Sequence, residues 1–233
     1  MTTSSASGNP SKERLTADRI VDAALELMRT QGYDATSMRA IAKALDTGPA
    51  SLYAHVANRE ELDNLVLDRI ASSLTIPEPD PERWADQLKD LMREMLELYR
   101  AHPGSARAAM AIIPTGSGAI RATEGMLGIC LAGGISPQAA AWFCDLAPQY
   151  VGSVAVEESI WIARANSTGP GEEPDHEAID AQLTDYFQSL PPDLYPLTSP
   201  MAKVLTTGDG IDRFEFGVDV ILAGLAAVSH KYA

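Results

Sequence analysis

The stretch GYDATSMRAIAKALDTGPASLYAHVANREEL, residues 32–62, determines how the start of this chain folds. Residues 37–45 carry apolar side chains at helical spacing, and Asp46-Thr47-Gly48 follows as a turn, because these residue types favour turn conformations. Pro49 stands at a favoured first-turn position of the next helix, which Leu52 and Val56 anchor. Two short helices joined by a four-residue turn are typical of a helix-turn-helix, and we predict that motif here.

The segments on either side also have helical patterns. Thr16 caps a first helix, which Gly32 ends, and Asn58 with Glu61 forms a capping box for a fourth helix over residues 58–74. Almost every later segment also carries apolar residues at helical spacing. No stretch sustains the alternation of apolar and polar residues that marks a strand. We therefore predict an all-α fold, in which three N-terminal helices precede a larger helical domain.

The charge of the chain is distributed unevenly. The 233 residues have a net charge of −14 and are 45% hydrophobic, which indicates a globular protein with a sizeable core. Residues 1–62 contain seven basic and eight acidic side chains, whereas residues 63–233 contain eleven and twenty-four. The acidity belongs to the C-terminal part, so the N-terminal segment remains compatible with contacts to phosphate.

The sequence gives no sign of a membrane segment or a secretion signal. No run approaches the roughly 20 apolar residues of a span, and residues 1–13 lack the apolar centre of a signal peptide. We expect a cytoplasmic protein without membrane contact, with residues 1–13 as a disordered tail. Cys130 and Cys144 lack the spacing of metal ligands, so we expect buried, reduced thiols, no metal and no cofactor.

The third helix is predicted to present an unusual set of side chains to solvent. Because Leu52 and Val56 face inward, helical geometry turns Ser51, Tyr53 and His55 outward. A hydroxyl, an aromatic ring and an imidazole can contact phosphates, sugars and base edges. This surface therefore suits the major groove of DNA.

Arg59 lies in the first turn of the fourth helix, where the helix dipole disfavours a cation. A DNA phosphate at this helix start would offset the unfavourable placement. The alternative is a simple balance by Glu60 and Glu61.

These residues resemble the DNA-binding domain of the TetR (tetracycline repressor) family of transcription regulators, over about residues 14–62. The similarity lies in Thr-x-x-x-x-Ile-Ala before the turn, then Leu-Tyr-x-His-Val, then Asn-Arg-Glu-x-Leu. The resemblance implies a DNA-binding domain to which the helix over 58–74 connects the rest of the chain. The DNA-contacting residues that we predict are Ser37, Arg39, Thr47, Gly48, Pro49, Ala50, Ser51, Tyr53, His55 and Arg59.

Several positions depart from the family's pattern. Asp46 stands where glycine is usual, and aspartate tolerates the left-handed conformation that this turn requires. Gly48 replaces the usual capping serine or threonine. Ala50 and Ala54 leave the third helix with few long side chains that could read bases, so the family pattern does not predict an operator sequence.

The segment FEFGVDVILAGLAA, residues 214–227, resembles the last dimerisation helix of the subgroup that contains the tetracycline repressor. The resemblance implies that residues 75–233 form an effector-binding and dimerisation domain, in which this helix and the helix over 137–165 join two subunits. A homodimer would bind a palindromic operator in double-stranded DNA. The alternative is that the last helix packs within its own subunit. The interface residues that we predict are Trp142, Phe214, Gly217, Val218, Ile221, Leu225 and Val228.

Methionines and aromatic residues on the helices after residue 83 suggest an effector cavity. Methionine suits irregular pockets, although an apolar helical stripe is ordinarily core. We expect a small apolar or aromatic effector. Tetracycline with magnesium fits poorly, because relatives that bind it use histidines, and this part of the chain has only His102, His176 and His230. The predicted lining residues are Met92, Met95, Tyr99, Met110, Ile113, Met126, Ile129, Phe143, Leu146 and Tyr150.

The resemblance implies a repressor that a small molecule releases from DNA by shifting the fourth helix. Two other classes remain open. A dimeric interaction module without DNA binding would agree with the overall acidity. An enzyme is the third class, but residues 115–118, TGSG, lack the lysine of a phosphate loop, and no His/Asp/Ser cluster is apparent.

Overall fold

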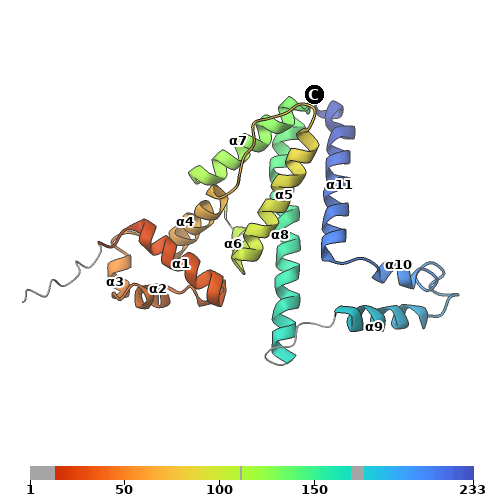
Figure 1. Cartoon of the computed structure of the whole chain (residues 1–233), viewed down its shortest axis with the longest axis horizontal. Coiled ribbons are helices and arrows are strands. Elements are labelled where there is room, and N and C mark those ends of the chain that lie inside the picture. Colours follow the sequence, from red (N-terminus) through yellow and green to blue (C-terminus); the bar gives the residue numbers. More distant parts are fainter. Residues whose placement is uncertain (1–13, 111, 169–175) are drawn as a thin grey trace, which may run out of the picture.

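The computed structural model describes residues 14–110, 112–168 and 176–233, and the regular elements in these ranges are helices (Figure 1). The all-α prediction is confirmed. The predicted tail over residues 1–13 lies outside the described residues. Within the described ranges, no helix combines the length and the apolar character that a membrane crossing requires.

The first four helices surround one apolar core. They are α1 (Ala17–Gln31), α2 (Met38–Ala44), α3 (Pro49–Leu52) and α4 (Arg59–Ser72), with the 3-10 turn η1 (Tyr33–Ala35) after α1. Ile20, Ile41, Leu52 and Leu62 are at most 1% exposed in this first core. Ile70, near the end of α4, belongs to the same core, so most of α4 is part of this unit.

Side-chain caps fix where three of these helices begin. Thr16, Ser37 and Asn58 each accept a hydrogen bond from the backbone N–H three residues later, at 3.3, 3.2 and 2.8 Å. Each cap satisfies an N–H group that the start of a helix leaves unpaired. The Thr16 and Asn58 caps predicted for the first and fourth helices are confirmed, but the predicted capping box is not formed, because the Glu61 carboxylate accepts from the Ala57 N–H and not from the Asn58 N–H.

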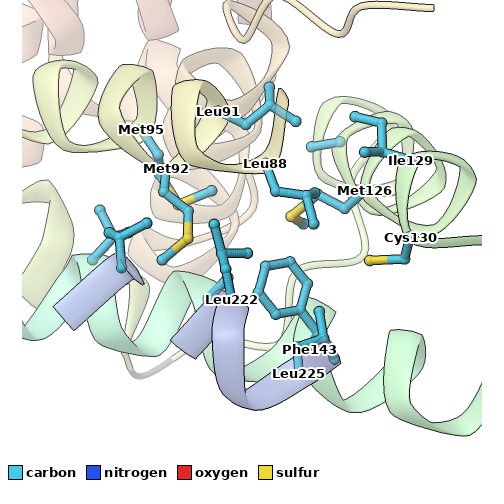
Figure 2. Close-up of a cluster of buried hydrophobic side chains, with 14 of the residues drawn as sticks. Leu88, Leu91, Met92, Met95, Met126, Ile129, Cys130, Phe143, Leu222 and Leu225 are labelled. Atoms are coloured by element: carbon cyan, nitrogen blue, oxygen red, sulfur yellow. The ribbon is translucent and has the colours of Figure 1, made fainter. Parts of the chain in front are cut away.

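The later helices form a larger body around a second core (Figures 1 and 2). Leu88, Met92, Ile129, Phe143 and Val218 are at most 2% exposed there. The helices are α5 (Trp84–Ala101), α6 (Ser105–Ala109), α7 (Ser117–Ala132), α8 (Pro137–Thr168), α9 (His176–Gln188), α10 (Ala202–Thr206) and α11 (Gly210–Val228), followed by η2 (Ser229–Tyr232).

Helices α9 and α10 pack on each other and extend away from the rest of the body (Figure 1). We call residues 176–206 the arm. Large apolar side chains on it are exposed: Tyr186 by 60%, Leu194 and Leu197 by 73%, and Val204 by 66%. Exposed apolar surface of this extent is typical of an interaction surface.

Candidate DNA-binding surface and ligand cavity

The turn between α2 and α3 has the geometry that the sequence predicts. Asp46 has a φ of 49°, which is the left-handed conformation, and the Thr47 N–H donates to the Ala42 carbonyl at 2.9 Å. Gly48 precedes α3 without a side-chain cap, and Pro49 stands in the first turn. Aspartate therefore replaces the usual glycine here without loss of the turn.

Helix α3 exposes the side chains that were expected to face outward. Leu52 and Val56 are 0% and 1% exposed, whereas Tyr53 is 52% exposed, and Ser51 and His55 are exposed too. The regular part of α3 is a single turn, and residues 53–55 continue it as turns.

Most of the other predicted DNA contacts are also accessible. Thr47 is half-buried, and the exposed ones are Ser37, Arg39, Gly48, Pro49 and Ala50. We call the following nine residues the reader surface: Ser37, Arg39, Thr47, Gly48, Pro49, Ala50, Ser51, Tyr53 and His55.

Arg59 has partners within the chain that the sequence analysis did not predict. Its Nε donates to the two Asp63 carboxylate oxygens at 2.8 and 3.0 Å, and its Nη2 donates to Thr36 Oγ1 at 3.0 Å. Its Nη1 donates to the Thr36 carbonyl, and its guanidinium carbon lies 4.7 Å from the centre of the Tyr33 ring. Within the chain, the anion beside this guanidinium is Asp63, one helical turn away.

Tyr33 completes this network. Its hydroxyl donates to Asp63 Oδ2 at 2.7 Å, and burial together with this hydrogen bond raises the pKa of the phenol. Thr36 is 2% exposed and Asp63 is 9% exposed. The network ties α4 to the segment that leads into α2, so Arg59 supports the reader surface from behind.

A cavity of about 330 Å³ lies among α4, α5, α6, α7 and α8. Its volume falls within the range of small-molecule sites. Four of the ten predicted effector residues line it, namely Met95, Tyr99, Met110 and Met126. Burial raises the pKa of the Tyr99 phenol, so this hydroxyl stays protonated at neutral pH.

The other predicted lining residues lie outside the cavity wall. Met92, Ile129 and Phe143 are at most 2% exposed in the second core (Figure 2). Ile113 and Leu146 are 81% and 48% exposed. The prediction was wrong for these residues, because helical spacing shows which side chains share a face and does not show whether that face borders a void.

Tyr150 was also predicted to line the cavity, but it joins α8 to α11 instead. Its ring stacks on Phe214 with the centroids 5.8 Å apart, and its hydroxyl donates to the Phe214 carbonyl at 3.2 Å. Gly217 permits this contact, since a Cβ there would lie 2.0 Å from the Tyr150 hydroxyl oxygen.

The sequence-based prediction omits the cavity wall that α4 provides. Asn64, Leu67, Asp68 and Ala71 line the cavity, at positions that share one face of the helix. Leu67, Ala71 and the following Leu74 give a second apolar stripe on α4, which could have revealed this face. The same helix therefore contacts both the first core and the cavity.

Helices α4 and α7 cap each other. The Asp68 carboxylate on α4 accepts hydrogen bonds from the N–H groups of Gly118 and Ala119 at 2.8 and 3.1 Å. In return, Arg121 on α7 donates to two carbonyls at the end of α4, at 2.7 and 2.9 Å. Gly118 allows this close approach, since a Cβ there would lie 2.1 Å from the Ser72 hydroxyl oxygen. The start of α7 and the end of α4 are thus held together beside the cavity.

A second junction joins the N-terminal unit to the larger body. The Tyr33 N–H donates to the Pro103 carbonyl at 2.9 Å, and Gly104 has a φ of 89°. A Cβ on Gly104 would lie 2.6 Å from the Tyr33 Cβ, so the turn needs glycine for both its conformation and its contact. Helix α6 follows directly, and its Ala106 and Ala109 line the cavity.

Half of the predicted dimerisation residues of α11 are buried within their own subunit. Phe214, Val218 and Leu225 are 2%, 0% and 8% exposed and pack into the second core. The residues that are half-buried are Gly217, Ile221 and Val228. The prediction was wrong for Phe214, Val218 and Leu225. Helix α11 is apolar on more than one side, and the helical spacing of its apolar residues does not say which side faces inward.

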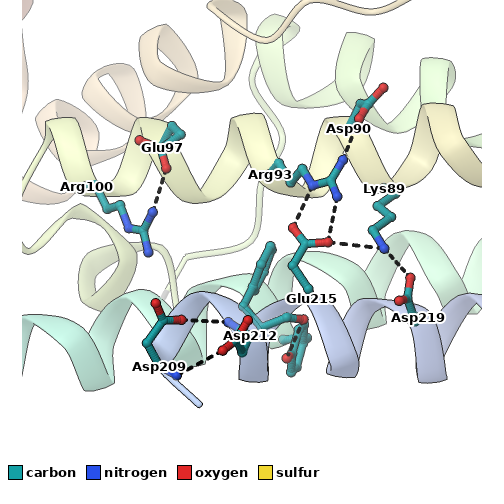
Figure 3. A network of polar contacts seen from close by, with 11 residues as sticks. Lys89, Asp90, Arg93, Glu97, Arg100, Asp209, Asp212, Glu215 and Asp219 are labelled. Carbon is teal, nitrogen blue, oxygen red and sulfur yellow. Dashed lines mark hydrogen bonds and ion pairs between the residues drawn. The ribbon is translucent and has the colours of Figure 1, made fainter.

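Ion pairs also attach α11 to α5 (Figure 3). Glu215 accepts hydrogen bonds from Nε and Nη2 of Arg93, both at 2.6 Å, and lies 3.1 Å from Lys89, which also pairs with Asp219. The Arg93 hydrogen bonds, helped by Lys89, lower the pKa of Glu215 to about 2. This face of α11 is committed to contacts within one subunit.

The outer sides of α8 and α11 expose a different apolar set. Phe216 and Val220, one turn apart on α11, are 71% and 54% exposed. Trp142 and Leu146, one turn apart on α8, are 54% and 48% exposed, and Tyr232 packs edge-on against Trp142 with ring centroids 5.0 Å apart. We call Trp142, Leu146, Phe216 and Val220 the outer face. Of the predicted interface residues, Trp142 is the one that belongs to it.

Comparisons with known proteins match nearly the whole chain. Residues 20–64 match the family described as "Bacterial regulatory proteins, tetR family", and residues 76–229 match "Tetracyclin repressor-like, C-terminal domain". The HTH-type transcriptional repressor DrrR1 of Streptomyces coeruleorubidus is 29% identical, over 92% of this chain and 78% of that protein. An HTH-type transcriptional regulator of Saccharopolyspora erythraea is 26% identical, over 94% of this chain and 87% of that protein.

A solved structure shares the fold at higher identity. ActR of Streptomyces coelicolor, a TetR family protein, in its complex with actinorhodin, has a TM-score of 0.83 and is 37% identical, over 95% of this chain and 100% of that chain. ActR in complex with (S)-DNPA gives a TM-score of 0.80 at the same identity, over 93% of this chain and 99% of that chain.

Proposed function

The chain belongs to the TetR family of ligand-responsive, DNA-binding transcription regulators, and from this premise we propose that it is a repressor that binds a palindromic operator as a homodimer and that a small molecule in the cavity releases it. The observation that carries the proposal is the position of α4. This helix forms part of the first core, beneath the reader surface, and also one wall of the cavity.

DNA binding is assigned to the reader surface. Arg39 and the N-terminus of α2 contact phosphates, whereas Ser51, Tyr53 and His55 enter the major groove. The single turn of α3, with Ala50 inside it and Ala54 just after it, favours readout of few bases and of the shape of the DNA. Arg59 is assigned a supporting role because its guanidinium is engaged by Asp63 and Thr36.

Dimerisation is assigned to the outer face. Exposed apolar stripes on α8 and α11 allow two subunits to bury them against each other in a four-helix interface with two-fold symmetry. The exposed apolar side chains of the arm offer additional surface to the second subunit. The two reader surfaces would then meet successive major grooves on one side of the operator.

Phe216→Ala is expected to weaken the dimer about tenfold, because large aromatic side chains dominate apolar interfaces. Sedimentation equilibrium across protein concentration measures the dissociation constant. Ile120→Ala is the matched control, since Ile120 is 57% exposed on α7 and lies outside the outer face. An unchanged dimer in the Phe216 variant, or an equal loss in the Ile120 variant, would place the interface elsewhere.

Release is assigned to α4. A molecule in the cavity contacts Asn64, Leu67 and Asp68, and it presses on the wall that α7 shares with α4 through mutual capping. Displacement of α4 changes the separation of the two reader surfaces in the dimer. Ligand and operator then weaken each other's binding by the same factor, as linkage requires.

Fluorescence anisotropy with DNA from the promoter of the chain's own gene tests the proposal. Binding that falls steeply with salt is expected, because each phosphate contact releases counterions. A small molecule that binds the cavity should lower operator affinity in the same assay. Failure to bind any promoter fragment would favour an interaction module without DNA binding, and a bound ligand that leaves operator affinity unchanged would contradict the release mechanism.

A further inference from the structure

We propose that the cavity prefers an uncharged or cationic effector to an anionic one, and that Asp145 on α8 sets this preference. The inference rests on the proposed function, because it concerns the molecule that occupies the cavity. It follows from the charges on the cavity wall and from the hydrogen-bonding groups that the wall leaves free.

The charged side chains of the wall are acidic. Asp68 and Asp145 line the cavity, and its described lining residues include no lysine, arginine or histidine. Asp68 already accepts hydrogen bonds from the N–H groups of Gly118 and Ala119, where the α7 dipole also favours its negative charge. Asp145 is exposed, and its carboxylate has no hydrogen bond or ion pair among the described residues. The uncompensated charge of the wall is therefore that of Asp145.

The backbone beside Asp145 contributes a second acceptor. Pro148 lies inside α8 and has no N–H to donate to the carbonyl four residues earlier, which belongs to Cys144. Cys144, Asp145 and Pro148 all line the cavity. A carboxylate and a carbonyl that lacks its ordinary helix donor thus occupy the same turn of the cavity wall.

Two possible donors on the wall are engaged within the protein. The Thr123 hydroxyl donates to a carbonyl of its own helix at 3.0 Å, and the Cys144 thiol lies 3.9 Å from the Thr123 carbonyl oxygen. Burial raises the pKa of Cys144 to about 11, so the thiol stays uncharged at neutral pH. The Tyr99 phenol and the amides of Asn64 and Gln149 can bond to a ligand without selecting its charge.

Asp145 is exposed, so a ligand in the cavity displaces only the water on the cavity side of its carboxylate, and a charge contact there is strengthened to that extent. An ammonium or hydroxyl group can donate to the Asp145 carboxylate and to the Cys144 carbonyl. A ligand carboxylate brings a like charge to acceptors and has no proton to donate. The expected order of affinity is ammonium, then alcohol, then carboxylate.

Three probes with the same ring system test this order: 9-(aminomethyl)anthracene, 9-anthracenemethanol and anthracene-9-carboxylate. Fluorescence titration of the full chain at pH 7 gives the dissociation constant of each probe. We expect the ammonium probe to bind at least about tenfold more tightly than the carboxylate probe. Asp145→Asn should weaken the ammonium probe about tenfold, strengthen the carboxylate probe and leave the alcohol within about twofold.

Glu124→Gln is the matched control, because Glu124 is exposed on α7 and lies outside the cavity wall. This variant should keep the original order of affinities, and circular dichroism should show that both variants remain helical. Equal or tighter binding of the carboxylate probe, no binding of the ammonium probe, or an unchanged order in Asp145→Asn overturns the proposal.

Operator affinity measured with each probe distinguishes a failure of the charge preference from a failure of the proposed function. If the carboxylate probe binds most tightly and releases DNA, the charge preference is wrong and the proposed function stands. If the probes bind in the expected order and operator affinity does not change, the charge preference stands and the release mechanism is wrong.

Discussion

Arg59→Ala should lower the free energy of unfolding of the N-terminal unit by about 3 kcal/mol, because it leaves the nearly buried Asp63 carboxylate without its cation. It also removes the donors to Thr36 and the contact with the Tyr33 ring. Operator binding should weaken for every sequence, since the support of the reader surface is lost. The dependence of log K on log salt should keep its slope, because no phosphate contact is removed.

Two arginine variants provide the comparison. Arg69→Ala, also on α4, removes pairs with the exposed Asp18 and Asp22, and it should cost less than about 1 kcal/mol. Arg39→Ala should leave stability unchanged and reduce the salt slope by about one per reader surface. Chemical denaturation and anisotropy at several salt concentrations measure both quantities. A reduced slope in the Arg59 variant that remains folded would restore Arg59 to the phosphate contacts.

Gly118→Ala should destabilise the junction of α4 and α7 by about 3 kcal/mol, the upper end of the cost of overpacking. The new Cβ would lie 2.1 Å from Ser72 Oγ and 2.4 Å from the Asp68 carbonyl oxygen, and a backbone oxygen cannot turn away as a side chain can. Because α4 and α7 must separate, operator affinity and ligand affinity should both change. Thermal unfolding and the two binding assays measure the effect.

Gly224→Ala is the matched control for this substitution. Gly224 is also helical, and a Cβ there meets no atom within 4 Å. Replacing glycine by alanine inside a helix should then stabilise the protein by up to about 1 kcal/mol. Similar melting temperatures for the two variants would show that α4 and α7 tolerate separation, and the release mechanism would lose its structural basis.

The N-terminal unit could be predicted from sequence because its signals are local. Thr16 and Asn58 cap helices three residues before their bonded N–H groups, and Pro49, Leu52 and Val56 define α3 within eight residues. The left-handed turn at Asp46 follows from residue type. Caps and turns depend on a few neighbouring residues, so they are visible before the chain is folded.

The cavity could not be predicted in the same way, because it depends on how several helices meet. Met92 and Met95 lie one turn apart on α5 and both belong to the second core (Figure 2), yet only Met95 also borders the cavity. Phe214 and Phe216 are two residues apart on α11, and they are 2% and 71% exposed. Both pairs satisfy the same apolar pattern. Only the positions of neighbouring helices separate core from cavity and inner side from outer side.

For Arg59, the sequence contained a sign of its partner within the chain, but the prediction gave more weight to an external anion. A cation at a helix start suggests an external anion, but Asp63 stands four residues later, at the spacing where opposite charges pair on a helix. The structure satisfies the cation internally and adds Thr36, a partner 23 residues away. That long-range contact had no signal in the local sequence.

The junction of Tyr33 with Pro103 and Gly104 limits how this protein can be recombined with its relatives. A chimera that exchanges only residues 14–62 would place a foreign residue 33 against the 102–104 turn, where a side chain in place of Gly104 would bring its Cβ to 2.6 Å from the Tyr33 Cβ. It would also divide α4 between two parents, although Asp68 and Arg121 fit the ends of α4 and α7 to each other. A functional exchange of DNA specificity therefore has to transfer α4, the 102–104 turn and the start of α7 together, or else replace only the exposed side chains of the reader surface.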